Sequence, residues 1–237
     1  MRLSVTALVF GALLVTPGQA SASCAAVRPS ETQAWRAELL ARTAVSARPD
    51  GKIRQWLSPS RVGALLVLSG ARDREGRCWV QVRLPERPNV AKGWIAADSV
   101  ALSETPWRIE IRLDERLVTL VRAGEPVGSY RAVIGAPATP TPTGLFALVE
   151  AYKGRPSDFL GSWVLTLTAH SDVLQRYEGG DGRAALHGRG GDSLRDPLGQ
   201  AASHGCVRVS NAAIAGIVRR IGVAAIPGTP VEITPSG

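Results

Sequence analysis

A thiol, two imidazoles and several glycines gather in two short stretches of the sequence. The hexapeptide SHGCVR at residues 203–208 holds Cys206 two positions after His204, and an earlier stretch, ALHG, holds His187. A cysteine reacts as its thiolate, and a neighbouring imidazole can take the thiol proton. Gly205 lets backbone amides approach closely, as an oxyanion site requires. These residues predict a nucleophile, Cys206, with a histidine as its base.

The segment between the two stretches, residues 188–202, is rich in glycine and polar side chains. Such a loop allows two histidines that are distant in sequence to converge. Ser210 or Asn211 is placed to cap a helix at residues 212–221, and Gly222 is its stop. Alternating apolar residues before the loop predict a meander of hairpins. The expected strands here are residues 107–113, 116–121, 130–135 and 229–233.

An earlier part of the chain shows its own series of β-like segments. Residues 62–68 are apolar, residues 78–84 alternate with period two, and residues 92–95 close the pattern. Residues 103–106 read as a joint. The sequence therefore predicts a mainly β fold with two domains after an N-terminal signal. The predicted division is residues 1–22, 23–103 and 104–237.

The N-terminus reads as an export signal. Arg2 precedes a short apolar run at residues 3–15, and small residues follow, with cleavage expected after Ala22. The run is short for a membrane span. The alternatives are an uncleaved anchor and a lipoprotein modified at Cys24. After cleavage we expect no stable membrane span and an extracytoplasmic, wall-associated location.

The number of cysteines can be interpreted in the light of the expected export. The chain has three, which is an odd number for an oxidising compartment. The simplest arithmetic pairs Cys24 with Cys78 and leaves Cys206 for chemistry. The alternative is that Cys24 and Cys78 are both thiols.

Composition limits the class of partner. The chain has 237 residues and a formal net charge of +8, so a basic surface faces its surroundings. Such a surface suits anionic wall polymers or lipid head groups. The alternative is that the charge serves only to keep the protein soluble. No cluster of arginine and aromatic residues indicates nucleic-acid binding. A zinc site of His187, His204 and Cys206 is disfavoured because no CxxC, HExxH or nearby acidic ligand accompanies them.

Several ordered motifs together resemble a known family. The HG at residues 187–188, the SHGC at residues 203–206 followed by an aliphatic residue and arginine, the TPTGLF at residues 141–146 and the GGDGR at residues 179–183 are similar to the L,D-transpeptidases with a YkuD-type catalytic domain. The resemblance runs from about Trp107 to Ile233. It implies a β-sandwich-like domain whose cysteine loop lies beside a short helix. The pattern of residues 62–95 resembles a bacterial SH3-like small barrel.

The resemblance assigns roles to the central residues. His187 is the general base, and the Gly188 carbonyl orients its ring. The amides of Gly205 and Cys206 form the oxyanion site. From its spacing, two positions before Cys206 in an extended segment, His204 is expected to shape the pocket or assist the thiol, and a purely structural hydrogen-bonding role is the alternative. Asp181 and Asp192 are alternative partners for His187, although both fit ordinary turns, and His170 has no motif around it.

Three further residues are candidates for substrate binding. Arg208 binds a stem-peptide carboxylate or braces the loop. Ser203 contacts substrate or hydrogen-bonds within the loop. Tyr152 follows the TPTGLF motif, where members of the family carry a flap over the substrate.

The function implied is peptidoglycan L,D-transpeptidation through a cysteine thioester, with release of D-Ala and without metal or organic cofactor. The substrates are peptidoglycan stem peptides, and a monomer is expected. The same chemistry allows three alternatives: L,D-carboxypeptidation, attachment of a protein lysine to the wall, or exchange of D-Ala for another D-amino acid. A non-catalytic wall-binding scaffold is the alternative from another class.

Overall fold

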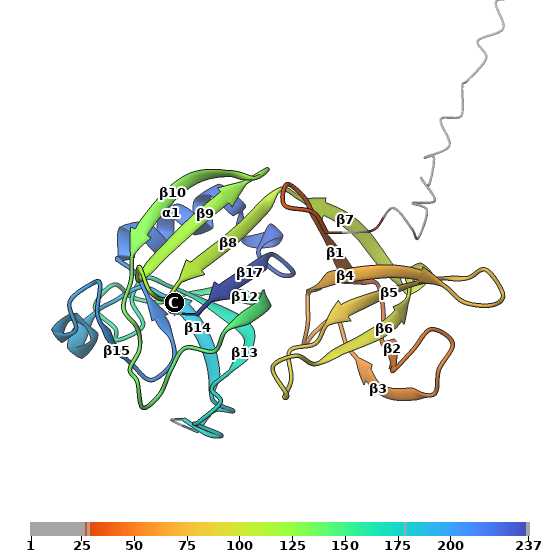
Figure 1. Ribbon diagram of the computed structural model, residues 1–237, viewed down its shortest axis with the longest axis horizontal. Coiled ribbons are helices and arrows are strands. Elements are labelled where there is room, and N and C mark those ends of the chain that lie inside the picture. The colour runs from red at the N-terminus through yellow and green to blue at the C-terminus, as the bar shows by residue number, and fades with distance from the viewer. Residues whose placement is uncertain (1–26, 28, 178, 236–237) are drawn as a thin grey trace, which may run out of the picture.

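The computed structural model describes residues 27, 29–177 and 179–235 of the chain. It shows two β-rich lobes side by side (Figure 1), so the predicted mainly β class is confirmed. The predicted signal and Cys24 lie outside the described residues. Within the described part of the chain, no helix is long and apolar enough to cross a membrane.

The N-terminal lobe is a seven-stranded antiparallel sheet with the strand order β3-β2-β6-β5-β4-β1-β7. Alternation places Val80 and Val82 of β5 in its core, which also contains Leu65 and Ile95. Strands occur where they were expected in β4, β5 and β6, whereas β1, β2, β3 and β7 were not anticipated. The SH3-like topology stays a prediction. The strands are β1 (Ala34–Leu39), β2 (Thr43–Ser46), β3 (Ile53–Leu57), β4 (Ala64–Arg72), β5 (Cys78–Arg83), β6 (Lys92–Ala96) and β7 (Val100–Thr105).

The expected joint at residues 103–106 is mostly strand. Ser103 and Glu104 pair with β1, and β7 ends only at Thr105. Pro106, which has no backbone N–H to donate, is the single residue before the next strand begins. The two sheets therefore follow each other without a flexible linker.

The C-terminal lobe is built on an eight-stranded sheet with the order β10-β9-β8-β17-β12-β13-β14-β16. Its early strands form the expected antiparallel meander, β8-β9-β10, although the third strand covers residues 125–131 rather than the expected 130–135. Strand β17 returns to pair in parallel with β8. A separate parallel pair joins β11 to β15. The strands are β8 (Trp107–Arg112), β9 (Leu117–Arg122), β10 (Glu125–Arg131), β11 (Ile134–Gly135), β12 (Gly144–Lys153), β13 (Trp163–His170), β14 (Arg183–His187), β15 (Ala201–Ser203), β16 (Val207–Arg208) and β17 (Pro230–Thr234).

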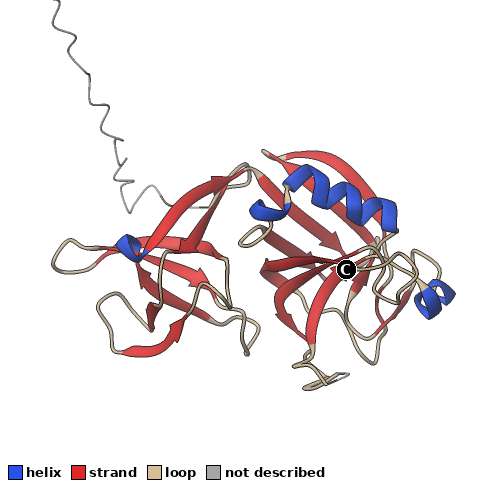
Figure 2. Ribbon diagram, turned by 180° about the vertical axis from the view of Figure 1, so that it is seen from behind, coloured by secondary structure: helices blue, strands red, loops and turns tan. Residues whose placement is uncertain are grey.

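The helix α1 (Asn211–Ile221) begins directly after the cysteine loop and lies across the second sheet (Figure 2). The Ser210 hydroxyl accepts a hydrogen bond from the Ala213 N–H at 3.1 Å, which caps its first turn. Gly222 has φ +85° and donates its N–H to the Val218 carbonyl, so it ends the helix as expected. Because α1 follows the cysteine loop at once, its packing fixes one end of that loop.

The two lobes pack against each other. Ala34 and Leu66 of the N-terminal lobe form a small buried cluster with Ala147 of the C-terminal lobe. The Arg36 Nε donates to the Pro227 carbonyl at 2.6 Å. The lobes are thus joined by apolar and polar contacts as well as by the chain.

Candidate active site

Cys206 and His187 open onto one cavity of about 490 Å³. Cys206 lies in the turn between β15 and β16, and β16 pairs in parallel with β14, at whose end His187 stands. This pairing brings together two residues separated by the long polar loop. The sheet therefore positions the thiol and the imidazole, although they come from different strands.

The His187 ring is almost fully buried, at 1% exposure. Its Nδ1 lies 2.7 Å from the Gly188 carbonyl, so we assign the proton to Nδ1, which leaves the lone pair on Nε2. Burial lowers the pKa of His187 to about 4; the Arg208 charge also lowers it, while the Gly188 and Leu160 carbonyls oppose the shift. At neutral pH the ring is uncharged and can accept a proton.

Asn211, expected only as a possible helix cap, holds the backbone around His187. Its Oδ1 accepts from the Ser162 N–H at 2.9 Å and the Arg189 N–H at 3.1 Å, and its Nδ2 donates to the Arg189 carbonyl at 2.8 Å. A Cβ on Gly188 would lie 2.2 Å from Asn211 Oδ1, and one on Gly161 2.3 Å from it. Glycine is therefore required at both positions for this close approach.

The cysteine loop is held from within by Ser203. The buried Ser203 Oγ donates to the Cys206 carbonyl at 2.5 Å and accepts from the Gly205 N–H at 3.1 Å. Ser203 does not line the cavity, and its hydrogen bonds lie within the loop, so its contact with substrate stays a prediction. The Gly205 N–H, expected as an oxyanion donor, is already bonded to Ser203. Gly205 itself has φ +114°, a conformation that glycine adopts readily.

Arg208 braces the polar loop. Its side chain is buried, its Nη1 lies 2.6 Å from Asp196 Oδ2, and its guanidinium stacks 4.9 Å from the Phe159 ring centre. Arg208 also lines the cavity, so contact with a substrate carboxylate stays a prediction. Asp196 lies just after a short 3-10 helix, η3 (Gly191–Arg195), that the sequence did not indicate.

His204 is exposed and faces Tyr177, a residue that was not predicted from the sequence. Its Nδ1 lies 3.4 Å from the Tyr177 hydroxyl, and the two ring centres are 5.0 Å apart. Both residues line the cavity beside Cys206. Tyr177 belongs to the β13–β14 loop, four residues before the aspartate of the GGDGR motif, which is the nearest sequence signal for it.

Tyr152 of β12 lies at the cavity and is 44% exposed. Burial, the Glu150 charge and the Cys206 charge all raise the pKa of its hydroxyl. Its predicted contact with substrate is therefore compatible with its place, and it remains a prediction.

The two aspartates considered as partners of His187 are engaged elsewhere. Asp181 contacts His170 Nε2 and Arg183 Nη2, both at 3.2 Å. Asp192 pairs with Arg195 on the surface. The Gly188 carbonyl is thus the group that orients the His187 ring.

Cys78 is disulfide-bonded, its predicted partner Cys24 lies outside the described residues, and Cys206 carries a thiol. Over the residues that the structure describes, no three His, Cys, Asp or Glu side chains come together as a metal site would need.

Comparison with known proteins points to one family. The model of YkuD, the L,D-transpeptidase catalytic domain, matches residues 106–233, more than half of the chain. No curated protein matches the sequence.

Similar solved structures include three L,D-transpeptidases. The catalytic domain of the E. faecium enzyme is 19% identical over 54% of this chain and 96% of that chain, with a TM-score of 0.39. A Xylanimonas cellulosilytica enzyme is 28% identical over 55% of this chain and 61% of that chain, with a TM-score of 0.36. L,D-transpeptidase 3 from Mycobacterium tuberculosis is 12% identical over 84% of this chain and 95% of that chain, with a TM-score of 0.46. This chain spans less than two thirds of the Xylanimonas structure.

Proposed function

The chain belongs to the YkuD family of L,D-transpeptidase catalytic domains, and from that premise we propose that it cross-links peptidoglycan stem peptides through a thioester on Cys206. The observation that carries the proposal is the shared cavity of Cys206 and His187, in which the imidazole is buried, neutral and oriented by the Gly188 carbonyl. With peptidoglycan as its substrate the protein would work outside the cytoplasm, in agreement with the export signal expected from the sequence.

Acylation begins when His187 Nε2 takes the proton of the Cys206 thiol. The thiolate attacks the carbonyl of the third stem residue, whose amide links it to the terminal D-Ala. A carbon–sulfur bond forms and the carbonyl oxygen becomes an oxyanion. When this intermediate collapses, the carbon–nitrogen bond breaks and His187 returns its proton to the leaving amine. D-Ala departs, and the stem remains as a thioester on Cys206.

Deacylation joins a second stem. The side-chain amine of its third residue attacks the thioester carbonyl, and the carbon–sulfur bond breaks. A proton from the amine passes through His187 to the departing thiolate. The product is an amide between two third-position residues, and the thiol is restored. Each step uses only protein side chains, backbone groups and the two stems.

The oxyanion is assigned to the backbone of the cysteine loop. One donor of such a site contributes about 3 kcal/mol to transition-state stabilisation. The Cys206 N–H belongs to the same residue as the attacking sulfur and is the donor we assign. The Gly205 N–H serves only if its bond to Ser203 Oγ opens.

The test is product analysis with a purified disaccharide-tetrapeptide. Wild-type protein is expected to release D-Ala and to form a cross-linked dimer, whereas Cys206→Ala should do neither. D-Ala release with a tripeptide product and no dimer would identify a carboxypeptidase, and incorporation of an added D-amino acid would identify exchange. Binding to purified sacculi without D-Ala release would overturn the proposal in favour of a wall-binding scaffold.

A further inference from the structure

The described residues of the β13–β14 loop, 171–177 and 179–182, include several that lie beside the thiol. Ser171, Leu174 and Tyr177 of this loop enclose, with Cys206, a small cavity of about 30 Å³. Tyr177 also reaches the main cavity, where it contacts His204. The position of the loop therefore sets the shape of the space next to the nucleophile.

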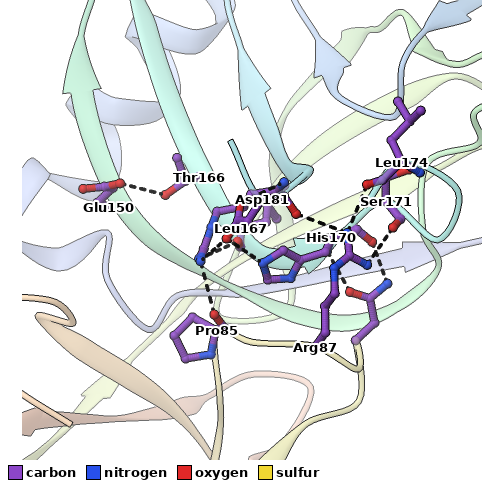
Figure 3. Close-up of polar contacts among 11 residues, drawn as sticks. Pro85, Arg87, Glu150, Thr166, Leu167, His170, Ser171, Leu174 and Asp181 are labelled. Atoms are coloured by element: carbon purple, nitrogen blue, oxygen red, sulfur yellow. Dashed lines mark hydrogen bonds and ion pairs between the residues drawn. The ribbon is translucent and has the colours of Figure 1, made fainter. Parts of the chain in front are cut away.

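Arg87 of the N-terminal lobe holds this loop from outside the catalytic lobe. From the segment between β5 and β6, its Nη1 donates to the Ser171 carbonyl at 2.8 Å, and its Nη2 donates to the carbonyls of Leu174 at 3.1 Å and Asp181 at 3.2 Å (Figure 3). A guanidinium carries five donors in a rigid planar fork, so one side chain can bind several carbonyls at once. Here it ties the two ends of the loop to its middle.

Asn89 fixes the point where the loop leaves β13. Its Nδ2 donates to the His170 carbonyl at 2.7 Å, and its Oδ1 accepts from the His170 N–H at 2.7 Å. The side-chain amide thus pairs with His170 as a neighbouring strand would. The same Nδ2 lies 2.9 Å from Asp172 Oδ1.

The other end of the loop is held in the same way. Arg183, the first residue of β14, donates from Nη2 to the Pro85 carbonyl at 3.2 Å and to Asp181 Oδ2 at 3.2 Å. Asp181 also contacts the buried His170 ring. Both stems of the loop therefore depend on residues 85–89 of the N-terminal lobe.

We propose that Arg87 and Asn89 are positioning residues for the active site: they hold the β13–β14 loop so that Tyr177 stays against His204 and the wall beside Cys206 stays closed. The N-terminal lobe is then a working part of the catalytic unit. The activity arm of the test rests on the proposed function, whereas loop protection and thiol accessibility are measured without it.

The experiment compares full-length Arg87→Gln with Arg77→Gln. Arg77 lies in the same lobe, and its exposed guanidinium pairs with Asp98 rather than with the loop, so it controls for loss of a surface charge. Arg87→Gln should speed hydrogen exchange in residues 171–182, speed alkylation of Cys206 by a bulky maleimide several-fold, and slow D-Ala release about tenfold. Arg77→Gln should leave all three within twofold of wild type. Asn89→Ala gives a second, independent variant if Arg87→Gln folds poorly.

A double-mutant cycle with Tyr177→Ala separates positioning from general stability. If Arg87 acts through Tyr177, adding Arg87→Gln to Tyr177→Ala should change D-Ala release less than twofold. Additive effects, or unchanged loop exchange and alkylation in Arg87→Gln, would overturn the inference. If wild-type protein releases no D-Ala, the proposed function fails, while exchange and alkylation still decide whether Arg87 positions the loop.

Discussion

His187 shows how burial and one hydrogen bond set the chemistry of a single residue. The ring is removed from water and donates from Nδ1 to the Gly188 carbonyl. Burial stabilises the neutral form, so imidazole rather than imidazolium is the resting species at pH 7. The lone pair on Nε2 is then ready for the thiol proton.

The depressed pKa of His187 predicts a loss of stability in acid. In the unfolded chain a histidine titrates near pH 6.5, whereas His187 titrates at about 4 in the fold. Between these values the unfolded state binds more protons, so the free energy of unfolding falls as pH drops, by about 3 kcal/mol in total. The stability that the neutral His187 ring contributes is fully present above pH 6.5 and is lost by pH 4.

Urea unfolding of wild type and His187→Gln at pH 7, 5.5 and 4.5 checks this. The pKa of His170 is also lowered, by burial and by Arg183, and adds to the slope of both proteins. The difference between the two proteins therefore isolates His187. Equal slopes would contradict the assignment of a buried neutral ring.

Ser203→Ala tests whether this hydroxyl serves the loop or the substrate. The change leaves the Cys206 carbonyl and the Gly205 N–H without their partner, which should cost about 1–3 kcal/mol of stability. Because the loop that carries Cys206 loses both bonds, kcat for D-Ala release should fall about tenfold. Because Ser203 lies outside the cavity, KM should stay within twofold. Ser60→Ala, at an exposed hydroxyl, is the control. A raised KM with normal kcat would indicate that Ser203 contacts the substrate.

At the scale of elements, local sequence patterns found the strands and helix with strong local signals. Alternation marked β5 and β8, and a serine and a glycine marked the ends of α1. β1 was missed because its sequence, AWRAEL, is rich in helix-forming residues, and its pairing with β4 and β7 makes it a strand.

The sequence singled out Cys206 and His187, which line one cavity, and missed the residues that support them. Cys206 and His187 stand out because their motifs are local. Tyr177, Asn211 and Asp196 act through contacts between segments far apart in the chain, and no local pattern encodes such pairing. The parallel register of β14 and β16, which brings the cysteine loop beside His187, is of the same kind.

Asn211→Ala tests the support of the loops around His187. Removing the amide frees the Ser162 N–H and both backbone groups of Arg189. We expect D-Ala release to fall at least tenfold and stability to fall by about 2 kcal/mol, because several partly buried hydrogen bonds are lost. Asn211→Asp keeps the acceptor oxygen, so its activity and stability should lie between those of wild type and Asn211→Ala. Kinetics and urea unfolding measure both, and wild-type values for Asn211→Ala would contradict this role.

At the scale of the whole molecule, the N-terminal lobe packs against the C-terminal lobe. An apolar cluster, the Arg36 contact with Pro227 and the Arg87 contacts join the lobes. The formal net charge of the chain is +8. Attraction to an anionic wall is the consequence expected of such a surface.

This charge predicts salt-dependent binding to the wall. The screening length falls from about 10 Å at 0.1 M salt to about 3 Å at 1 M, so exposed charges lose most of their reach. Pull-down on purified sacculi should therefore recover several-fold less protein at 1 M than at 0.1 M NaCl. Sacculi stripped of anionic polymers are the control. Recovery that does not change with salt would show that charge plays little part.

The central claim, that Cys206 is the acylated nucleophile, is tested most directly by intact mass after incubation with a carbapenem. The thiolate should open the lactam ring and add the full mass of the drug to wild-type protein, with the adduct on the peptide containing Cys206. Folded Cys206→Ala should gain no mass. Absence of an adduct on folded wild type whose Cys206 thiol is titratable, or an adduct that persists in Cys206→Ala, would contradict the account.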